Sequence, residues 1–213
     1  PITELEHAAF CKPEDELPAK SLAEEMAVNI RWQKISTEYL HLSAEEIDQR
    51  IHEAKQKLGK SVTVLGHHYQ REEVIKYADF QGDSFLLSQE AARLPDADYI
   101  VFCGVHFMAE TAKILSPKKT VLLPDRDAGC SLEESCPPDR LRELQATNPN
   151  FYTIAYVNCS AEVKALSDVI CTSGNAKKIV EAAPADRDLL FVPDENLGAW
   201  GIEQTGRPMT LWQ

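Results

Sequence analysis

Residues that could move protons or bind anions follow an apolar segment at 61–65. His67 and Tyr69 come directly after it, and both side chains can donate a hydrogen bond or exchange a proton. A histidine at this place could instead cap the following helix. Position at the end of a strand does not separate these two roles.

A second set of polar side chains follows the apolar segment 152–155. Tyr156 offers a phenol and Asn158 an amide, which together could orient a carboxylate or a carbonyl group. An asparagine is also common in ordinary turns, so either role remains open for Asn158.

Two serine-containing turns precede predicted helices. Ser84 stands before the helix expected at 85–93, and Ser173 lies in the turn 172–175. Serine is a favoured N-cap residue. The same geometry also directs free N–H groups and the positive end of the helix dipole at an anion. If both turns face one interface, they would form a pair of clamps for a dicarboxylate.

The cysteines are spread through apolar sequence and lack the density of a disulfide scaffold. They are Cys11, Cys103, Cys130, Cys136, Cys159 and Cys171. No Cys-x-x-Cys pair is present, so they are expected to be reduced thiols or metal ligands. Cys130 with Cys136 could form a two-cysteine metal site, a weak hypothesis. Cys103, Cys159 and Cys171 are expected to be small core residues.

The elements that must position these residues repeat along the chain. A shift of 89 positions brings Tyr156 onto His67 and Asp168 onto Asp79. Each copy predicts strand, helix, strand, helix, strand, with apolar runs that suit parallel sheets covered on both faces. The fold class is therefore α/β, with repeated three-layer αβα units. Ligands of such units bind at the carboxyl ends of the strands.

Three regions are expected. Residues 1–59 form an N-terminal extension with a helix, which begins at a capping box, Ser43 to Glu46, and carries an apolar stripe. Residues 60–149 form the first α/β unit with a linker that carries Cys130, and residues 150–213 form the second. The stripe consists of Ile47, Ile51, Ala54 and Leu58.

Charge and hydropathy exclude some functions. The formal net charge is −12 and the pI is near 5.0, which argues against a nucleic-acid or anionic-membrane partner. No apolar run approaches the ~20 residues of a membrane span, and no secretion signal opens the chain. A cytoplasmic location follows by default.

The order and spacing of these segments resemble the quinolinate synthase family from about residue 60 to the end. The stretches that carry the resemblance are 65–70, 78–84, 107–115, 123–130, 156–158, 168–176 and 193–198.

The resemblance implies three homologous α/β units around a pseudo-threefold axis, of which this chain holds two. It implies a 4Fe–4S cluster bound by three cysteines, one from each unit, which leave one iron open as a Lewis acid. By position, Cys130 is the first cluster ligand and Tyr69 is the proton-transfer phenol. The residues implied to bind iminoaspartate are His67, Ser84, Tyr156, Asn158 and Ser173.

The implied reaction condenses iminoaspartate (iminosuccinate) with dihydroxyacetone phosphate to give quinolinate, phosphate and water in de novo NAD biosynthesis. L-aspartate oxidase or aspartate dehydrogenase would supply the iminoaspartate. The other two cluster cysteines and the third unit are expected beyond residue 213, so this chain is expected not to turn over alone.

Two other functions compete with this one. A cluster-free module could bind a small dicarboxylate or a sugar phosphate. An α/β hydrolase or isomerase could use His67 as a base, but the Gly-x-Ser-x-Gly nucleophile motif is absent from the sequence.

Overall fold

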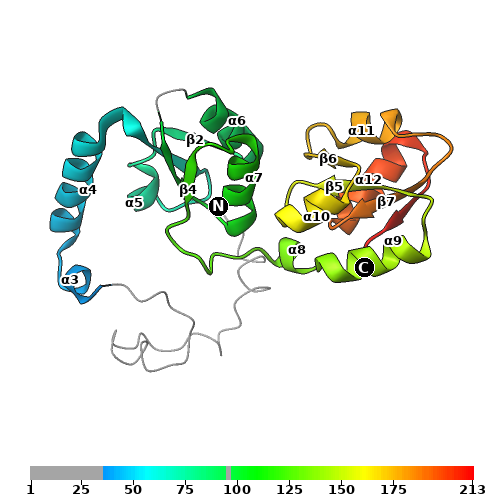
Figure 1. The fold of residues 1–213 in the computed structure, drawn as a ribbon, viewed down its shortest axis with the longest axis horizontal. Coiled ribbons are helices and arrows are strands. Elements are labelled where there is room, and N and C mark those ends of the chain that lie inside the picture. The colour runs from blue at the N-terminus through cyan, green and yellow to red at the C-terminus, as the bar shows by residue number, and fades with distance from the viewer. Residues whose placement is uncertain (1–35, 95–96) are drawn as a thin grey trace, which may run out of the picture. The chain divides into compact units, whose positions relative to one another are not determined.

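Two parallel four-stranded sheets with the same strand order make up most of the computed structural model, which describes residues 36–94 and 97–213 (Figure 1). The first has the order β2-β1-β3-β4 and the second β6-β5-β7-β8. The strands are β1 (Val62–His67), β2 (Phe80–Gly82), β3 (Tyr99–Cys103), β4 (Thr120–Leu122), β5 (Phe151–Tyr156), β6 (Val169–Cys171), β7 (Asp188–Val192) and β8 (Met209–Leu211). The predicted α/β class is confirmed. Cys11 and most of the predicted N-terminal extension lie outside the described residues.

Helices connect successive strands, as parallel pairing requires. Those up to the end of the first sheet are α3 (Thr37–Leu40), α4 (Ala44–Leu58), the short 3-10 helix η2 (Gly59–Ser61), α5 (Glu72–Ile75), α6 (Ser84–Arg93) and α7 (His106–Leu115). The later ones are α8 (Ser131–Glu134), α9 (Pro138–Thr147), α10 (Ala161–Leu166), α11 (Ala176–Ala182) and α12 (Glu195–Thr205).

The predicted repeat is confirmed strand by strand, since each strand of the second sheet begins 89 positions after its counterpart. The register also repeats between the first three strands of each sheet. It slips by one residue at the last strand. Tyr99 pairs with Thr120, whereas Leu189, one position beyond the counterpart of Tyr99, pairs with Met209.

An aspartate fixes the same strand pair in both sheets. Asp79 accepts from the backbone N–H of Val64 at 2.8 Å and donates its own N–H to the Val64 carbonyl. Asp168 does the same with Thr153 at 2.8 Å. Asp79 and Asp168, which the 89-residue shift aligns, therefore have a structural role. Each forms hydrogen bonds with the backbone N–H and carbonyl of one residue in the first strand of its sheet.

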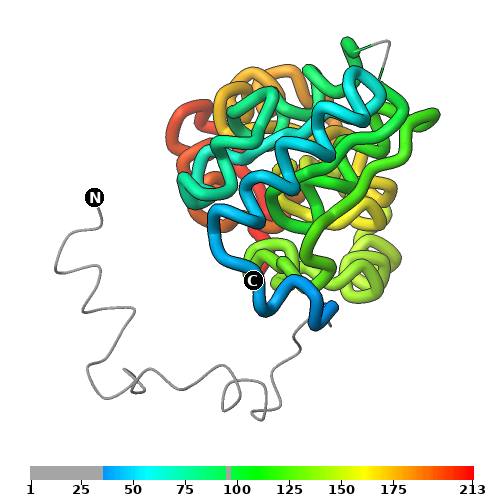
Figure 2. The backbone as a smooth tube through the Cα atoms, turned by 90° about the vertical axis from the view of Figure 1, so that its left-hand side faces the viewer, coloured from blue at the N-terminus to red at the C-terminus, as the bar shows by residue number. Residues whose placement is uncertain are grey.

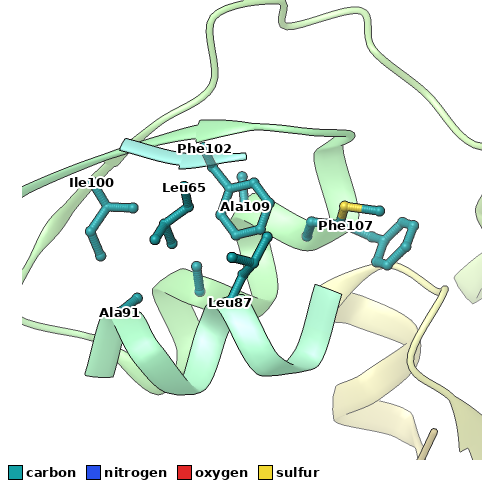
Figure 3. Close-up of a cluster of buried hydrophobic side chains, with 9 residues drawn as sticks. Leu65, Leu87, Ala91, Ile100, Phe102, Phe107 and Ala109 are labelled. Atoms are coloured by element: carbon teal, nitrogen blue, oxygen red, sulfur yellow. The ribbon is translucent and has the colours of Figure 1, made fainter. Parts of the chain in front are cut away.

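The core of the first unit lies between β1 and β3 and the helices α6 and α7. In Figure 3, Leu65 and Phe102 extend from the strands toward Leu87 and Ala91 of α6, and all four side chains are fully buried. Phe107 of α7 lies at the edge of this cluster, beside the yellow ribbon of the second unit (Figure 3). Burial of these side chains contributes about 1.5–3 kcal/mol for each large one.

The second sheet is buried on both faces. Ile154 packs in one cluster and its neighbour Ala155 in another, and Phe191 and Leu190 alternate in the same way along β7. Successive side chains of a strand point to opposite faces, so a continuous apolar run is what a doubly covered sheet needs.

Helix α4 forms where the sequence predicts it, but its apolar stripe is not buried. The capping box of Ser43 and Glu46 is present, and none of the helical side chains is buried by the described residues. Ile47 is 38% exposed and Leu58 48%. In Figure 2, α4 (blue to cyan) lies on the side of the described chain that faces the viewer.

Polar contacts attach α4 to the segment that leads into β2. Lys55 contacts the Asp79 carboxylate at 2.7 Å. The Tyr77 hydroxyl donates to Asp48 at 2.7 Å, and Lys76 lies 2.6 Å from the same carboxylate. The prediction of the helix is therefore confirmed, but it docks through polar side chains.

Within residues 36–94 and 97–213, no helix combines the length and the apolar character that a bilayer crossing requires.

Candidate active site

The carboxyl end of β1 requires a glycine. A Cβ atom on Gly66 would lie 2.4 Å from Ile75 Cδ1 and 2.9 Å from Ala78 Cβ. Only glycine therefore allows α5 and the residues after it to pack against the end of this strand. The next residue, His67, is consequently covered and is only 6% exposed.

His67 is a neutral hydrogen-bond donor in this environment. Burial lowers its pKa to about 4, assisted by the neighbouring His68 and opposed by Asp83. Its Nδ1 atom accepts from the backbone N–H of Tyr69 at 3.4 Å. The imidazole proton is therefore assigned to Nε2, which is free to donate to a ligand.

Tyr69 stacks against His67, with ring centroids 3.9 Å apart and an interplanar angle of 40°. Its hydroxyl donates to Met108 Sδ at 3.8 Å, and the side chain is 52% exposed. Burial raises the pKa of Tyr69, and the charge of Cys130 adds to this shift. The phenol therefore keeps its proton at neutral pH.

A pocket of about 420 Å³ brings together residues from both sheets. The first contributes the start of α6, and the second contributes the turns after β5 and β6. Its lining consists of Asp83, Ser84, Phe85, Leu86, Gln89, Tyr156, Val157, Asn158, Thr172, Ser173 and Gly174. Four of the five residues that the resemblance implies to bind iminoaspartate thus line one pocket, and His67 does not. Both serine turns contribute to the lining.

Ser84 is not the helix cap. Asp83 has that role, since its carboxylate accepts from the N–H groups of Phe85 at 3.0 Å and Leu86 at 2.9 Å. The expectation that α6 offers free N–H groups to an anion is therefore wrong for these two donors. Ser84 is buried as the first helical residue, and its hydroxyl makes no hydrogen bond within the described part of the chain.

The second turn is also held by a neighbouring side chain. Asn175 Oδ1 accepts from the backbone N–H of Thr172 at 2.7 Å. Ser173 stands exposed between them and lines the pocket. The two serines therefore present hydroxyl groups that the local turns do not use.

The pocket relies on neutral donors. Burial raises the pKa of Tyr156, and Asp194, Cys171, Cys130 and Asp83 add smaller contributions of the same sign. Its phenol is therefore protonated at neutral pH. Among the described lining residues Asp83 is the only charged one. A dicarboxylate would thus depend on hydroxyl, phenol and amide groups, and on any bound metal.

The described cysteines divide into two kinds. Burial raises the pKa of Cys103, and it raises the pKa of Cys136 to about 12, of Cys159 to about 11 and of Cys171 to about 12. These raised pKa values favour protonated thiols at neutral pH when no metal is bound. Cys130 is half-buried, precedes α8 and packs at the edge of the first core.

Two expectations about cysteines need correction. Cys136 is 1% exposed and belongs to a core cluster of the second sheet, which argues against a two-cysteine site with Cys130. Cys103 is half-buried at the end of β3, so only Cys159 and Cys171 have the predicted core position.

Sequence reasoning missed some residues of the pocket. Asp83 could have been found, because aspartate is a favoured N-cap and precedes an apolar helix. Gln89 could not have been found in this way, because it lines the pocket only through the orientation of α6 about its axis, which the local sequence does not indicate.

The chain is a parallel α/β protein with a pocket lined by residues that follow the carboxyl ends of its strands. A family model described as quinolinate synthetase A protein matches residues 49–213, so the chain belongs to that family.

Relatives named quinolinate synthase support this membership. The one from Synechocystis is 57% identical over 153 residues, which cover 72% of this chain and 48% of the relative. The one from Chloroherpeton thalassium is 50% identical over 180 residues, which cover 84% of this chain and 55% of the relative. The one from Microcystis aeruginosa is 55% identical over 163 residues, which cover 76% of this chain and 50% of the relative. The chain spans about half the length of the curated relatives it matches.

Proposed function

We propose that the protein containing this chain is a quinolinate synthase, which condenses iminoaspartate with dihydroxyacetone phosphate in NAD biosynthesis. The observation that carries the proposal is the shared pocket of Ser84, Tyr156, Asn158 and Ser173 in a member of this family. Iminoaspartate is a small dicarboxylate, and these side chains are all potential hydrogen-bond donors to its carboxylate groups.

The residues of β1 and β5 would have different roles. His67 donates from Nε2, because its Nδ1 is already engaged by the Tyr69 N–H. Tyr69 carries its proton at neutral pH and would act first as an acid in the dehydration and ring-closing steps. Tyr156 and Asn158 would hold the substrate without exchanging protons.

Cys130 fits the role of a ligand to the 4Fe–4S cluster that the family resemblance implies. It is half-buried, and its charge contributes to the raised pKa of both Tyr69 and Tyr156. When bound, the cluster supplies an open iron that acts as a Lewis acid. One thiolate does not hold such a cluster, and the other two ligands are proposed to follow residue 213.

In this proposal the reaction takes place in the cytoplasm, and L-aspartate oxidase or aspartate dehydrogenase supplies the unstable imine. The α/β units are proposed to divide at residues 60–149 and 150–213, with residues 1–59 as an extension.

A cluster-free binding module is the second candidate. It is favoured by the location of all four pocket residues within this chain. Such a module would bind a dicarboxylate without iron and would form no new carbon–carbon bond.

The test uses the full-length protein, reconstituted anaerobically with iron and sulfide. We expect about four iron atoms per chain and formation of quinolinate from the two substrates. Cys130→Ala should lose the cluster and the activity, whereas Cys103→Ala, which changes another half-buried thiol, should retain both. A wild-type protein that binds a dicarboxylate but no iron would support the binding module, and a Cys130→Ala variant that keeps the brown cluster would refute the assignment of the ligand.

A further inference from the structure

Helix α7 carries a contact between the two units that the proposed function leaves unexplained. Glu110 of α7 accepts from the backbone N–H of Ala161 at 2.7 Å. Ala161 is the first residue of α10, and an N–H group at that position has no acceptor within its own helix. The first unit therefore completes the N-terminus of a helix in the second unit.

A lysine forms a second link at the same place. Lys164 Nζ lies 5.5 Å from the ring centroid of Phe107, a cation–π distance, and it donates to the carbonyl of Cys159. Burial lowers the pKa of Lys164, while Cys159, Glu110 and Glu133 oppose this shift. The half-buried ammonium group thus interacts electrostatically with both carboxylates.

Both links act on the segment that carries a pocket residue. Asn158 precedes Cys159, whose carbonyl binds Lys164, and Ala161 follows shortly after. The position of Asn158 is therefore fixed from α7 by contacts on its C-terminal side.

The opposite side of the pocket is linked to the same helix. Ser84 begins α6, which packs on α7, and Leu87 and Ala91 of α6 share one core cluster with Ala109 and Ala112 of α7. Glu110 of α7 in turn contacts Ala161, three residues after Asn158.

We propose that Glu110 is a positioning residue that sets the separation of Ser84 and Asn158 across the pocket. It thereby selects the length of the dicarboxylate that both sides can bind at once. The inference rests on the proposed function of the pocket but not on turnover. Glu110 itself does not line the pocket.

A cation site is the other use these side chains could have. Atoms of His106, Glu110 and Glu133 lie within 4.8 Å of one another. Glu110 already accepts from the Ala161 N–H, and the half-buried Lys164 ammonium contributes positive charge to its surroundings. These contacts favour a purely protein-based junction.

The experiment compares Glu110→Ala and Glu110→Gln with the matched control Glu203→Gln in the full-length protein. Glu203 is an exposed carboxylate on α12. Hydrogen exchange of the Ala161 amide, succinate and glutarate binding by calorimetry, and total metal content are measured for each variant. We expect Glu110→Ala to accelerate exchange at Ala161 and to weaken succinate binding by about tenfold, and glutarate binding by less. Glu110→Gln should largely restore the protection, because its amide oxygen can still accept.

The outcomes separate this inference from others. Faster exchange throughout β5 and β7 in Glu110→Ala would indicate general destabilisation and overturn the positioning role. Unchanged exchange at Ala161, an equal loss of both diacids, or a divalent metal lost from the variant would overturn it as well. None of these measurements needs quinolinate formation, so an inactive wild-type protein would refute the proposed reaction alone.

Discussion

The backbone N–H of Tyr69 donates to Nδ1 of His67 at 3.4 Å, while the two rings stack at 3.9 Å. This arrangement fixes one tautomer of a buried imidazole and joins the two side chains into one unit. It also determines how the stability of the protein should respond to acid.

Stability should decrease as the pH falls from about 6.5 toward 4. The pKa of His67 is about 4 in the folded protein and near 6.5 when unfolded, so the unfolded state binds more protons in this window. The contribution of the neutral His67 to stability is fully present above pH 6.5. A single titrating group changes the free energy of unfolding by at most about 1.4 kcal/mol per pH unit. The free energy of unfolding is measured with urea at pH 5 and at pH 7. Its change between the two pH values should be smaller for His67→Gln than for the wild type. An unchanged difference would contradict the buried neutral histidine.

Gly66→Ala should destabilise the protein by about 1–3 kcal/mol, because a Cβ atom there overlaps Ile75 and Ala78. Gly174→Ala is the control, since its Cβ would meet only Thr172 Oγ1 at 3.8 Å. Thermal unfolding of both variants checks the difference. Equal unfolding temperatures would show that α5 moves away at little cost.

Asp83→Ala should cost about 1 kcal/mol through loss of the helix cap, and Asp83→Asn much less. Because Asp83 is the charged group of the described pocket lining, Asp83→Asn should also bind succinate severalfold more tightly. Calorimetry and thermal unfolding separate the two effects. Weaker binding by the asparagine variant would mean that the carboxylate contacts the ligand favourably.

Tyr69→Phe should keep the cluster and the fold of the full-length protein but lose about 100-fold or more in turnover. The phenol is half-exposed and makes only a long contact with Met108 Sδ, so its removal leaves no buried polar atom unpaired. Steady-state assays with the iron content measured in parallel test this. An undiminished rate would remove Tyr69 from proton transfer.

The sequence predicted the sheets well because their signals are local. Apolar runs such as 62–67 and 151–156 appear as buried strands, and the spacing of Asp79 and Asp168 carried the repeat. The apolar stripe predicted the helix α4 correctly, but an apolar pattern does not indicate which surface the helix packs against. Polar contacts of Lys55 and Asp48 hold that helix instead.

Four residues of the pocket had been singled out from the sequence, but their hydrogen bonding had not been predicted. Ser84 and Ser173 could be placed at strand ends, because the topology of parallel sheets brings such ends together. The capture of helix N–H groups by Asp83 was not predicted, and neither was the contact of Glu110 with Ala161. The Asp83 cap depends on the rotamer of a single side chain. The contact between Glu110 and Ala161 depends on how α7 and α10 pack together, which the sequence of neither helix indicates.

The two copies match in backbone but differ in what they carry at the same strand end. One presents an imidazole and a half-exposed phenol, and the other presents a phenol and a primary amide. If the proposed function is correct, a near-symmetric scaffold with unlike strand ends would distinguish one end of a four-carbon diacid from the other. The proposed substrate would then bind in a single orientation, with the same carbon always directed toward its reaction partner.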